Sequence, residues 1–200
     1  MIFIYKPIMK SLLFLLFLAP ISLFAQLRDS VYIKTDIYEC VYSEVLEQPK
    51  WIKYTVLCPE GNAPRKGMDF YTEQGIKTSD NADYANNIYD KGHMAPAADF
   101  NCTKEMLYKT FSYVNCALQN QDLNRVAWRL LESKERELAK EGKVSVYIKV
   151  DFSKEKLPTG ATVPSGFYKE MSVNGKKTCY YFKNEKPASS DYNKAQCNCR

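Results

Sequence analysis

Residues 89–99 read Tyr-Asp-Lys-Gly-His-Met-Ala-Pro-Ala-Ala-Asp and contain His93, the one histidine of this 200-residue chain. Residues 122–132 then read Asp-Leu-Asn-Arg-Val-Ala-Trp-Arg-Leu-Leu-Glu, which places Asn124 and Glu132 in a helical pattern. An unperturbed imidazole titrates near pH ~6.5, so it can accept a proton from water at neutral pH. Together the two stretches indicate a hydrolytic site with one base and one metal ion. On the residues alone, a purely structural His93 remains the alternative.

The second stretch predicts the clearest helix of the chain, from Leu123 to about Lys140. Asp122 stands where an N-cap belongs, and Gly142 stands where the helix should stop. Apolar residues recur at the spacing of a core-facing stripe, namely Leu123, Ala127, Leu130, Leu131 and Leu138.

One broad face of this helix carries candidate site residues. Asn124, Trp128 and Glu132 are spaced i, i+4, i+8, and each step drifts by about 40° around the helix. The amide oxygen of Asn124 is a hard ligand that suits Mg²⁺, which often keeps several waters and uses few protein ligands. Glu132 can hold such waters. The spacing alone also fits an ordinary helix with Asn124 near its cap, Trp128 in the core and Glu132 in solvent.

Strands are predicted on both sides of this helix. Residues 31–42 and 51–57 have alternating β-branched and aromatic character, with Gln48-Pro49 between them. Asn174-Gly175 is a good hairpin signal between two later strands. The other expectations are strands over 69–76, 110–116, 144–150, 166–171 and 178–182, a helical turn over 103–108, loops over 58–67 and 79–87, and a turn over 87–92. Strands before and after one dominant helix indicate an α+β fold.

The first 25 residues predict an export signal. Lys6 and Lys10 precede an almost wholly apolar run that ends in a small residue suited to cleavage. An uncleaved anchor is the alternative, but the run is shorter than the ~20 residues of a membrane span and Pro20 interrupts it. We therefore expect a signal peptide over residues 1–25 and one domain over residues 26–200. The mature protein should reach a periplasm or the medium without stable membrane association.

The charge balance says little about partners. The predicted signal contains two lysines and no acidic residue, so the formal charge falls from +5 to +3 on its removal. A mildly basic protein can bind a polyanion, but this charge does not argue for one. The 15 tyrosines could stack on bases, although strand and core positions are more common for them.

The cysteines indicate disulfide bonds. Export to an oxidising space makes disulfides the default for an exported chain, and an odd number leaves at least one thiol unpaired or paired between chains. Zinc binding is the competing interpretation, but the chain has no Cys-x-x-Cys pair. The pairing itself does not follow from the sequence. All seven cysteines lie after the predicted signal: Cys40, Cys58, Cys102, Cys116, Cys179, Cys197 and Cys199.

The two stretches resemble the DNA/RNA non-specific endonuclease family, which includes secreted bacterial nucleases and mitochondrial endonuclease G. The similarity begins with Asp-Lys-Gly-His-Met-Ala-Pro-Ala-Ala-Asp over residues 90–99 and continues through Asn115, Gln119 and Leu123-Asn124 to Trp128-x-x-Leu131-Glu132. It also covers Trp51-Ile52-Lys53-Tyr54, Ser79-Asp80 and Val163-Pro164-Ser165-Gly166-Phe167-Tyr168-Lys169. The resemblance therefore spans about residues 31–182, and the combined spacing is highly specific.

This resemblance implies a ββα-metal, or His-Me finger, nuclease fold with a central antiparallel sheet and one catalytic helix. It implies that His93 is the general base, that Asn124 is the one direct protein ligand of Mg²⁺ (with Mn²⁺ as the other candidate), and that Glu132 orients metal-bound water. Asn115 and Gln119 would position substrate. DNA and RNA would both be cleaved, through phosphate contacts, to leave 5′-phosphate ends.

The chain departs from the family pattern at three positions. Lys91 stands where the family usually has Arg, so a point charge replaces a planar fork at a site expected to contact phosphate. Val114 replaces the usual Ser before Asn115, and Leu118 replaces the usual Pro before Gln119.

Two other functions stay open at this stage. A non-catalytic, exported nucleic-acid-binding module on the same scaffold would explain Lys91 as a mark of lost catalysis. A disulfide-rich structural or adhesion domain would have no affinity for nucleic acid. Arg125, near Lys91 in this reading, is expected to be a solvated surface charge.

Overall fold

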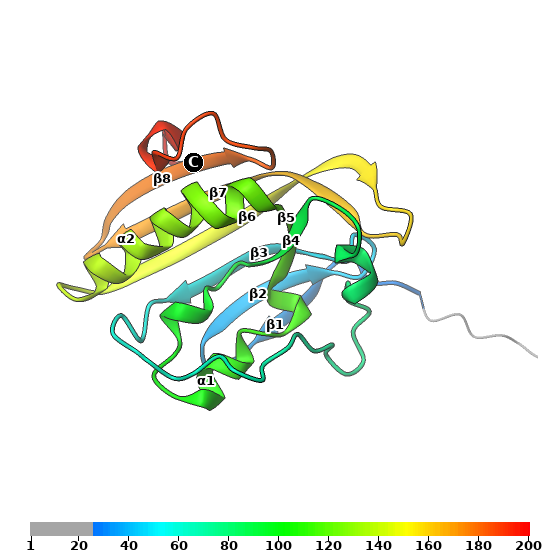
Figure 1. Cartoon of the computed structure of the whole chain (residues 1–200), viewed down its shortest axis with the longest axis horizontal. Coiled ribbons are helices and arrows are strands. Elements are labelled where there is room, and N and C mark those ends of the chain that lie inside the picture. Colours follow the sequence, from blue (N-terminus) through cyan, green and yellow to red (C-terminus); the bar gives the residue numbers. More distant parts are fainter. Residues whose placement is uncertain (1–25) are drawn as a thin grey trace, which may run out of the picture.

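An antiparallel sheet of seven strands forms the centre of the described part of the chain, residues 26–200 of this computed structural model. The strands follow the order β1-β2-β3-β6-β7-β8-β9, and β4 and β5 form a separate two-stranded sheet. Figure 1 shows the long helix α2 lying across one face of the large sheet. The predicted signal peptide lies outside the described residues. The strands are β1 (Val31–Lys34), β2 (Tyr38–Ser43), β3 (Gln48–Thr55), β4 (Tyr89–His93), β5 (Cys116–Asn120), β6 (Val144–Lys156), β7 (Thr162–Val173), β8 (Lys176–Lys183) and β9 (Gln196–Cys197).

Helices are few within residues 26–200. Two are α-helical, α1 (Lys104–Lys109) and α2 (Arg129–Ala139), and a π-helix over Leu123–Trp128 leads directly into α2. Short 3₁₀ turns cover Asn81–Tyr84, Ala97–Asp99, Tyr113–Asn115 and Tyr192–Ala195. No helix within residues 26–200 has the length and apolar character needed to cross a membrane. The observed elements agree with the predicted mixture of one large antiparallel sheet and one dominant helix.

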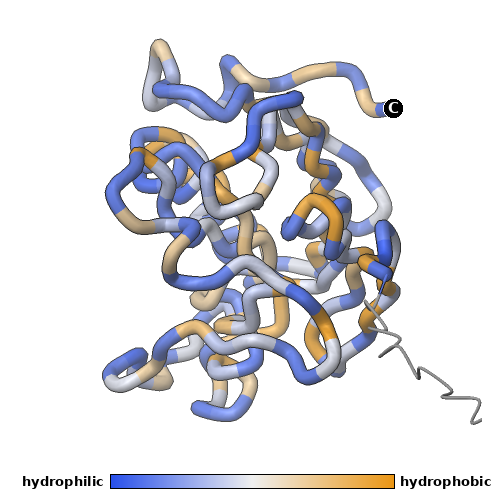
Figure 2. The backbone as a smooth tube through the Cα atoms, turned by 90° about the vertical axis from the view of Figure 1, so that its right-hand side faces the viewer, coloured by the Kyte–Doolittle hydropathy of each residue, from blue (hydrophilic) through white to orange (hydrophobic). Residues whose placement is uncertain are grey.

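The core lies between α2 and the sheet. Along β6, Val144, Val146, Ile148 and Val150 are buried and alternate with more exposed residues, because successive side chains of a strand point to opposite faces. The tube in Figure 2 accordingly mixes hydrophobic and hydrophilic residues along most segments. The predicted hairpin between β7 and β8 is confirmed, and Asn174 and Gly175 both have the positive φ that its tight turn requires.

Four sequence expectations about strands and turns are wrong. The expected turn over residues 87–92 is largely β4, because Gly92 here pairs with Ala117 of β5. The expected strand over 69–76 is reduced to one isolated bridge between Tyr71 and Ser112. Residues 110–116 follow α1 and contain the 3₁₀ turn Tyr113–Asn115, and of these residues Cys116 alone belongs to a strand, β5. Gln48-Pro49 lies inside β3, where a register shift in β2 accommodates the proline.

The start of the dominant helix also differs from expectation. Asp122 makes no side-chain capping bond. Instead, Asn120 Oδ1 accepts hydrogen bonds from the backbone N–H groups of Asp122, at 3.0 Å, and Leu123, at 3.3 Å. The first six helical residues, Leu123–Trp128, then form a π-helix, a feature often found at functional sites. The side chain that satisfies the helix start therefore belongs to the last residue of β5.

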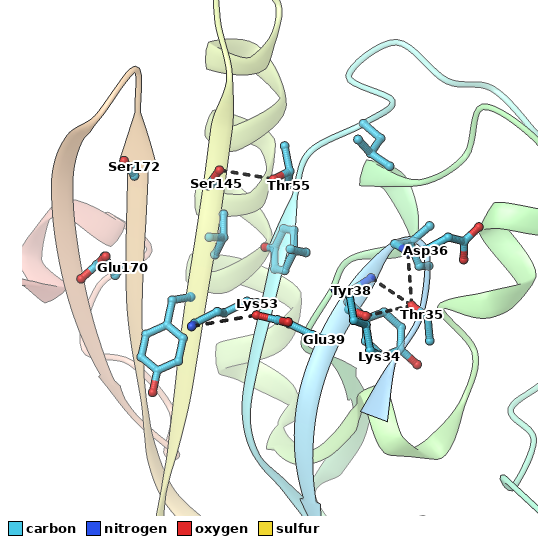
Figure 3. Close-up of a pocket in the computed structure, with 15 residues that line it drawn as sticks. Lys34, Thr35, Asp36, Tyr38, Glu39, Lys53, Thr55, Ser145, Glu170 and Ser172 are labelled. Atoms are coloured by element: carbon cyan, nitrogen blue, oxygen red, sulfur yellow. Dashed lines mark hydrogen bonds and ion pairs between the residues drawn. The ribbon is translucent and has the colours of Figure 1, made fainter. Parts of the chain in front are cut away.

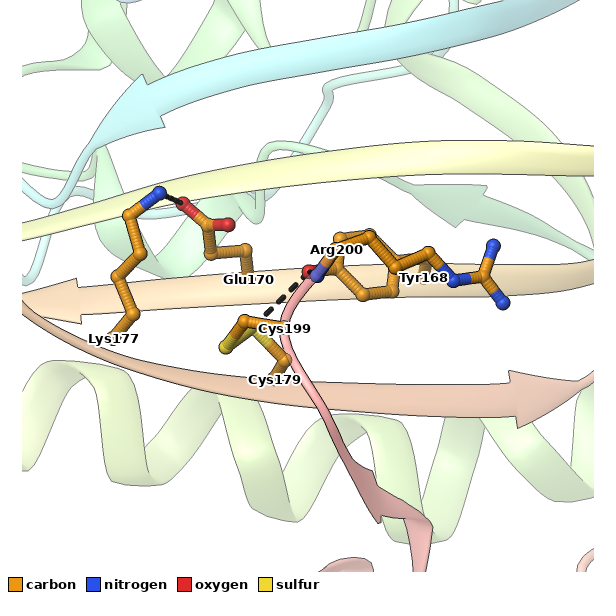
Figure 4. Close-up of a disulfide and its surroundings, with 6 residues drawn as sticks. All are labelled: Tyr168, Glu170, Lys177, Cys179, Cys199 and Arg200. Carbon is orange, nitrogen blue, oxygen red and sulfur yellow. Dashed lines mark hydrogen bonds and ion pairs between the residues drawn. A yellow bond between two sulfur atoms is a disulfide. The ribbon is translucent and has the colours of Figure 1, made fainter.

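Two disulfides form, which agrees with the default reading of the cysteines. Cys58–Cys102 brackets the segment that carries His93, and Cys179–Cys199 ties the C-terminal residues to β8. Figure 4 shows Arg200 beside the ring of Tyr168 next to this second disulfide. The expected surplus of thiols is confirmed, since Cys40, Cys116 and Cys197 form no disulfide.

Candidate active site

A cavity of about 490 Å³ lies where the end of β4 faces the π-helix and α2. It brings together four of the predicted site residues, His93, Asn124, Glu132 and Lys91. The same cavity contains residues from the loop before β4. Its lining consists of Arg65, Lys91, His93, Pro96, Ala97, Ala98, Asn124, Arg125, Arg129, Glu132, Ser133 and Arg136.

His93 is the last residue of β4 and is partly buried among aromatic rings. Its ring centroid lies 4.8 Å from that of Phe70 and 5.0 Å from that of Phe111. Burial, helped by the positive charge of Arg65, lowers the pKa of His93 to about 3. Within the described residues, Nε2 has no hydrogen-bond partner. The imidazole is therefore neutral at physiological pH and retains a lone pair with which to accept a proton.

The backbone after His93 is held by Asn115 rather than by the strand ladder. The amide Oδ1 of this fully buried residue accepts from Ala95 N–H at 2.7 Å. Its Nδ2 donates to the carbonyls of Ala95 and Thr110, both at 2.9 Å. The amide of Asn115 is thus committed to the backbone, and the residue does not line the cavity. Its influence on the site runs through the position of the His93 segment.

Gln119 is also placed away from the cavity. It is fully buried in β5, and its side chain crosses Gly92 so closely that a Cβ there would collide with it. This contact explains why the residue before His93 is a glycine. Neither Asn115 nor Gln119 lines the cavity, and the substrate-positioning role expected for them stays a prediction.

Asn124 has a fixed orientation. Its Nδ2 donates to Asp90 Oδ2 at 3.0 Å, and the same carboxylate accepts two hydrogen bonds from Arg125, at 2.9 and 2.6 Å. Because the amide nitrogen faces Asp90, the amide oxygen is left free to accept or to coordinate. Arg125 is exposed, as expected, but its bidentate pair with Asp90 gives it a role in holding this arrangement.

Glu132 occupies the α2 side of the cavity. Burial raises its pKa to about 7, and the attraction of Lys169 is the largest opposing influence. Trp128, which shares the helix face in sequence, is fully buried in the core and does not line the cavity. Of the three residues predicted to share one face of the helix, Asn124 and Glu132 line the cavity, whereas Trp128 packs in the core beneath it.

The cavity is strongly cationic. Five of its lining residues are basic and Glu132 is its one acidic lining residue. Arg136 is anchored by Asp99, a fully buried carboxylate whose Oδ1 accepts from Nη1 at 2.8 Å. Arg65, Arg129 and Arg136 were not identified from sequence. Arg136 follows Glu132 by one helical turn, and this spacing could have indicated that Arg136 lies at the site. Arg65 lies in an irregular loop, where no sequence periodicity indicates its position.

The sequence matches the DNA/RNA non-specific endonuclease family over residues 24–200. The chain belongs to this family. Curated relatives include the mitochondrial nuclease EXOG of Danio rerio, 30% identical over 102 residues, and mitochondrial endonuclease G of Bos taurus, 32% identical over 83 residues. These alignments cover 48% and 40% of this chain but 30% and 28% of the relatives, so the chain spans under a third of their length. A nuclease of Nostoc is 43% identical over 60 residues, which are 30% of this chain and 22% of the relative.

A solved structure shares the fold. A chain from the crystal structure of an EndoG/EndoGI complex superposes with a TM-score of 0.73 and 25% identity, over 84% of this chain and 80% of that chain. The large antiparallel sheet with few helices is therefore an EndoG-like nuclease fold.

The family departure at Lys91 has a structural counterpart. Its ammonium donates to Asn81 Oδ1, lies 3.6 Å from Asp69 Oδ1, and sits over the rings of Phe70 and Tyr113 at 5.2 and 5.4 Å. The ammonium group of Lys91, at the edge of the cavity, thus interacts with four groups at once. A phosphate that reached Lys91 would have to compete with them.

The residues present suit a hard divalent cation with few protein ligands. Within residues 26–200, no three His, Cys, Asp or Glu side chains cluster as a metal site. Asn124, whose amide nitrogen is bonded to Asp90, and Glu132 nevertheless both line the cavity. Mg²⁺ commonly keeps several waters and binds through one or two protein oxygens, so this donor set fits it.

A second cavity, of about 570 Å³, lies on the other face of the large sheet. In Figure 3 the labelled side chains of Lys53, Ser145 and Glu170 lie on the side of the strands turned away from α2. Lys34, Asp36, Glu39, Lys53 and Glu170 give it mixed charge, and it contains no histidine. The larger cavity therefore lacks both the base and the cationic lining of the smaller one.

Proposed function

We propose that this chain is a metal-dependent endonuclease that hydrolyses phosphodiester bonds of DNA and RNA without sequence specificity. The observation that carries this proposal is the meeting, in one cation-lined cavity, of a neutral imidazole on β4 and an asparagine on the following helix whose amide nitrogen alone is bonded, to Asp90. The activity is in keeping with the family of the chain.

His93 is the general base in this proposal. Its Nε2 accepts a proton from a water molecule as that water attacks phosphorus. The aromatic walls formed by Phe70 and Phe111 exclude bulk water and keep the imidazole neutral, so the lone pair is available at physiological pH. Asn115 keeps the imidazole in place by holding the backbone two residues further on.

Asn124 is the direct protein ligand for Mg²⁺, or for Mn²⁺ in its place. Asp90 holds the amide nitrogen, which leaves the amide oxygen available to an ion. When bound, such an ion stabilises the negative charge that develops on the phosphate and on the leaving 3′ oxygen. Glu132 accepts hydrogen bonds from water at the same site and thereby orients it. Cleavage of the bond to the 3′ oxygen leaves the phosphate on the 5′ end.

The arginines of the cavity hold the substrate by its phosphates. Arg65, Arg129 and Arg136 present planar forks that match phosphate oxygens, and contacts of this kind carry no base information. Because DNA and RNA share this backbone chemistry, both polymers fit the same cavity. Lys91 is a further, weaker phosphate contact because its charge is shared with Asn81 and Asp69.

The arrangement of β4, β5 and the following helix supports a ββα-metal finger. In this reading β4 supplies the base, the π-helix supplies the metal ligand, and α2 supplies the water-orienting carboxylate. Residues 26–200 form one nuclease domain with a short cysteine-containing tail. Export by the N-terminal segment is in keeping with two disulfides, which persist in oxidising compartments.

A non-catalytic nucleic-acid-binding module is the second candidate. One observation favours it, namely the enclosure of Lys91 by Asn81, Asp69 and two aromatic rings. If this side chain cannot reach phosphate, substrate could bind to the arginines without being aligned for attack.

One assay on the purified protein separates these candidates. Supercoiled plasmid and folded RNA are incubated with the protein and Mg²⁺, with Mn²⁺, or with EDTA. We expect both polymers to be degraded with either ion and left intact in EDTA, and we expect the products to accept label from polynucleotide kinase only after phosphatase treatment. Retention of DNA without cleavage under every metal condition would establish the binding module instead. Products labelled without phosphatase would refute the assigned bond cleavage.

A further inference from the structure

A charged pair lies in the core directly beneath the site. Lys169 of β7 and Glu135 of α2 are both fully buried, and Lys169 Nζ lies 2.6 Å from Glu135 Oε1. Lys169 points to the same face of β7 as Phe167 and Met171, so its charge is surrounded by apolar side chains. Taking two charges out of water is costly, and replacing a buried pair by apolar residues is often neutral or stabilising. A contribution to the stability of the fold therefore does not explain why this buried pair is present.

The pair connects two turns of the helix that carries Glu132. Trp128 and Glu135 are spaced i, i+7 and so lie on one face of the helix. Lys169 Nζ sits 4.4 Å from the centroid of the Trp128 ring and also contacts Glu135. One side chain of the sheet thus touches both ends of the segment at whose middle Glu132 lies.

A second strand holds the same carboxylate. The Tyr54 hydroxyl of β3 donates to Glu135 Oε2 at 2.7 Å, and this hydroxyl is fully enclosed. Glu135 is therefore fixed from β3 on one side and from β7 on the other. A carboxylate held at both oxygens sets the rotation of α2 about its own axis. That rotation decides whether Glu132, three residues earlier, faces the cavity.

Lys169 also acts on Glu132 through its charge. Burial makes the charged form of Glu132 unfavourable, Lys169 is the strongest attraction that opposes this, and Glu135 adds repulsion. Arg136 attracts Glu132 as well, while it is itself held by Asp99. The balance of charges around Glu132 therefore depends on a lysine that does not line the cavity.

We propose that Lys169 is a positioning residue of the nuclease site, which holds Trp128 and Glu135 so that the Glu132 carboxylate is presented to the cavity. This inference rests on the proposed nuclease function. Lys169 touches no substrate, and its effect is transmitted through α2.

The decisive variant replaces the pair by apolar residues of similar length, Lys169→Met/Glu135→Met. It removes both charges of the pair together, but it also leaves the enclosed Tyr54 hydroxyl without its acceptor. We therefore expect it to fold with a thermal midpoint within a few degrees of that of the wild type. We expect kcat for DNA cleavage to fall at least about tenfold, because Glu132 loses both its orientation and its nearest buried cation. KM, and affinity for a DNA duplex measured in EDTA, should change less than about threefold, since the arginines are intact.

The matched control lies on the exposed side of the same helix. Lys134→Met/Glu137→Met removes a surface ion pair of 3.0 Å and should leave kcat within about twofold of the wild type. Tyr54→Phe is the second test, for the case in which the double variant does not fold. It removes only the hydroxyl, and we expect a several-fold loss of kcat with KM unchanged.

A folded variant of either kind with wild-type kcat would overturn the proposal. A crystal structure of the double variant supplies a readout independent of turnover. We expect the Glu132 carboxylate to be displaced from the cavity, and an unchanged Glu132 position would also overturn the positioning role. If the wild-type protein itself cuts neither polymer, the nuclease proposal fails, while this structural comparison still decides the role of Lys169.

Discussion

The two cavities on opposite faces of the large sheet differ in what surrounds them rather than in size. The open-face cavity is the larger, at about 570 against 490 Å³, but its lining mixes Lys34, Lys53, Asp36, Glu39 and Glu170. The cavity beside α2 combines basic residues with a histidine whose Nε2 has no hydrogen-bond partner within residues 26–200. Cavity volume is therefore a poor guide to the candidate site in this protein. Unpaired polar atoms surrounded by charges of one sign are the better guide.

The largest difference between the cavities should appear on removal of His93. We expect His93→Ala to lower cleavage by about 10²–10⁴-fold, the usual contribution of a general base, with the fold retained. Initial rates of plasmid cleavage in Mg²⁺ provide the measurement. Lys53→Ala in the open-face cavity is the control and should cut at the wild-type rate. Equal rates for His93→Ala and wild type would show that His93 is not the base.

Phosphate contacts should distinguish the cavities by salt dependence. Arg129→Ala is expected to weaken duplex binding and to reduce the slope of log affinity against log salt by about 1, because one fewer counterion is released. Lys53→Ala should leave the slope unchanged. Fluorescence anisotropy in EDTA at several salt concentrations measures both. If the two variants lose affinity alike, DNA contacts both faces and the contrast between the cavities is wrong.

Stability should depend on pH through Glu132. Its pKa is about 7 in the folded protein and near 4.5 when exposed, so the folded state binds the extra proton between these values. Stability from this group therefore falls as pH rises from about 4.5 to 7 and stays low above that. We expect Glu132→Gln to raise the thermal midpoint at pH 8 and to have no such effect at pH 5. For a protein of this size, a gain of 1 kcal/mol in stability raises the midpoint by about 2–4 °C.

Scanning calorimetry in EDTA at pH 5 and pH 8 tests this prediction. Glu39→Gln in the open-face cavity is the control, because Glu39 belongs to a partly exposed pair with Lys53 that contributes little. A midpoint gain for Glu132→Gln that is the same at both pH values would mean that charge burial is not its cause.

The smallest effect is expected from Lys91→Arg. A planar fork can bond a phosphate while still meeting Asn81, so we expect activity equal to or up to about threefold above that of the wild type. Plasmid cleavage under identical salt conditions measures it. A large loss of activity would show that the groups around Lys91, including Phe70, are adapted to a point charge.

Several features followed directly from the sequence because they depend on local physics. The β7–β8 hairpin was predicted from Asn174-Gly175, whose residues tolerate positive φ. The body of α2 followed from its apolar stripe. The expected strand over residues 110–116 was wrong because Phe111 and Tyr113 pack into the protein from an irregular segment. Aromatic composition alone cannot distinguish such a segment from a strand.

The residues of the candidate site also divide into those that the local sequence indicated and those that it did not. His93, Asn124 and Glu132 were recognisable because their spacing lies within two short stretches. Arg65 was not, because the loop that brings it to the cavity has no periodic signal. The backbone contacts of Asn115 were not predicted, since nothing in the sequence tells a buried amide from an exposed one.

By itself, the sequence determined the dominant helix, the β7–β8 hairpin, the family and the residue types of the candidate site, because hydrophobic period, turn chemistry and motif spacing are encoded locally. The tertiary structure alone decided which arginines surround the site, which thiols pair, and that Lys169 and Glu135 meet beneath Glu132. These contacts join residues distant along the chain. Burial and partner geometry, which exist only after folding, then set the protonation of His93 and Glu132.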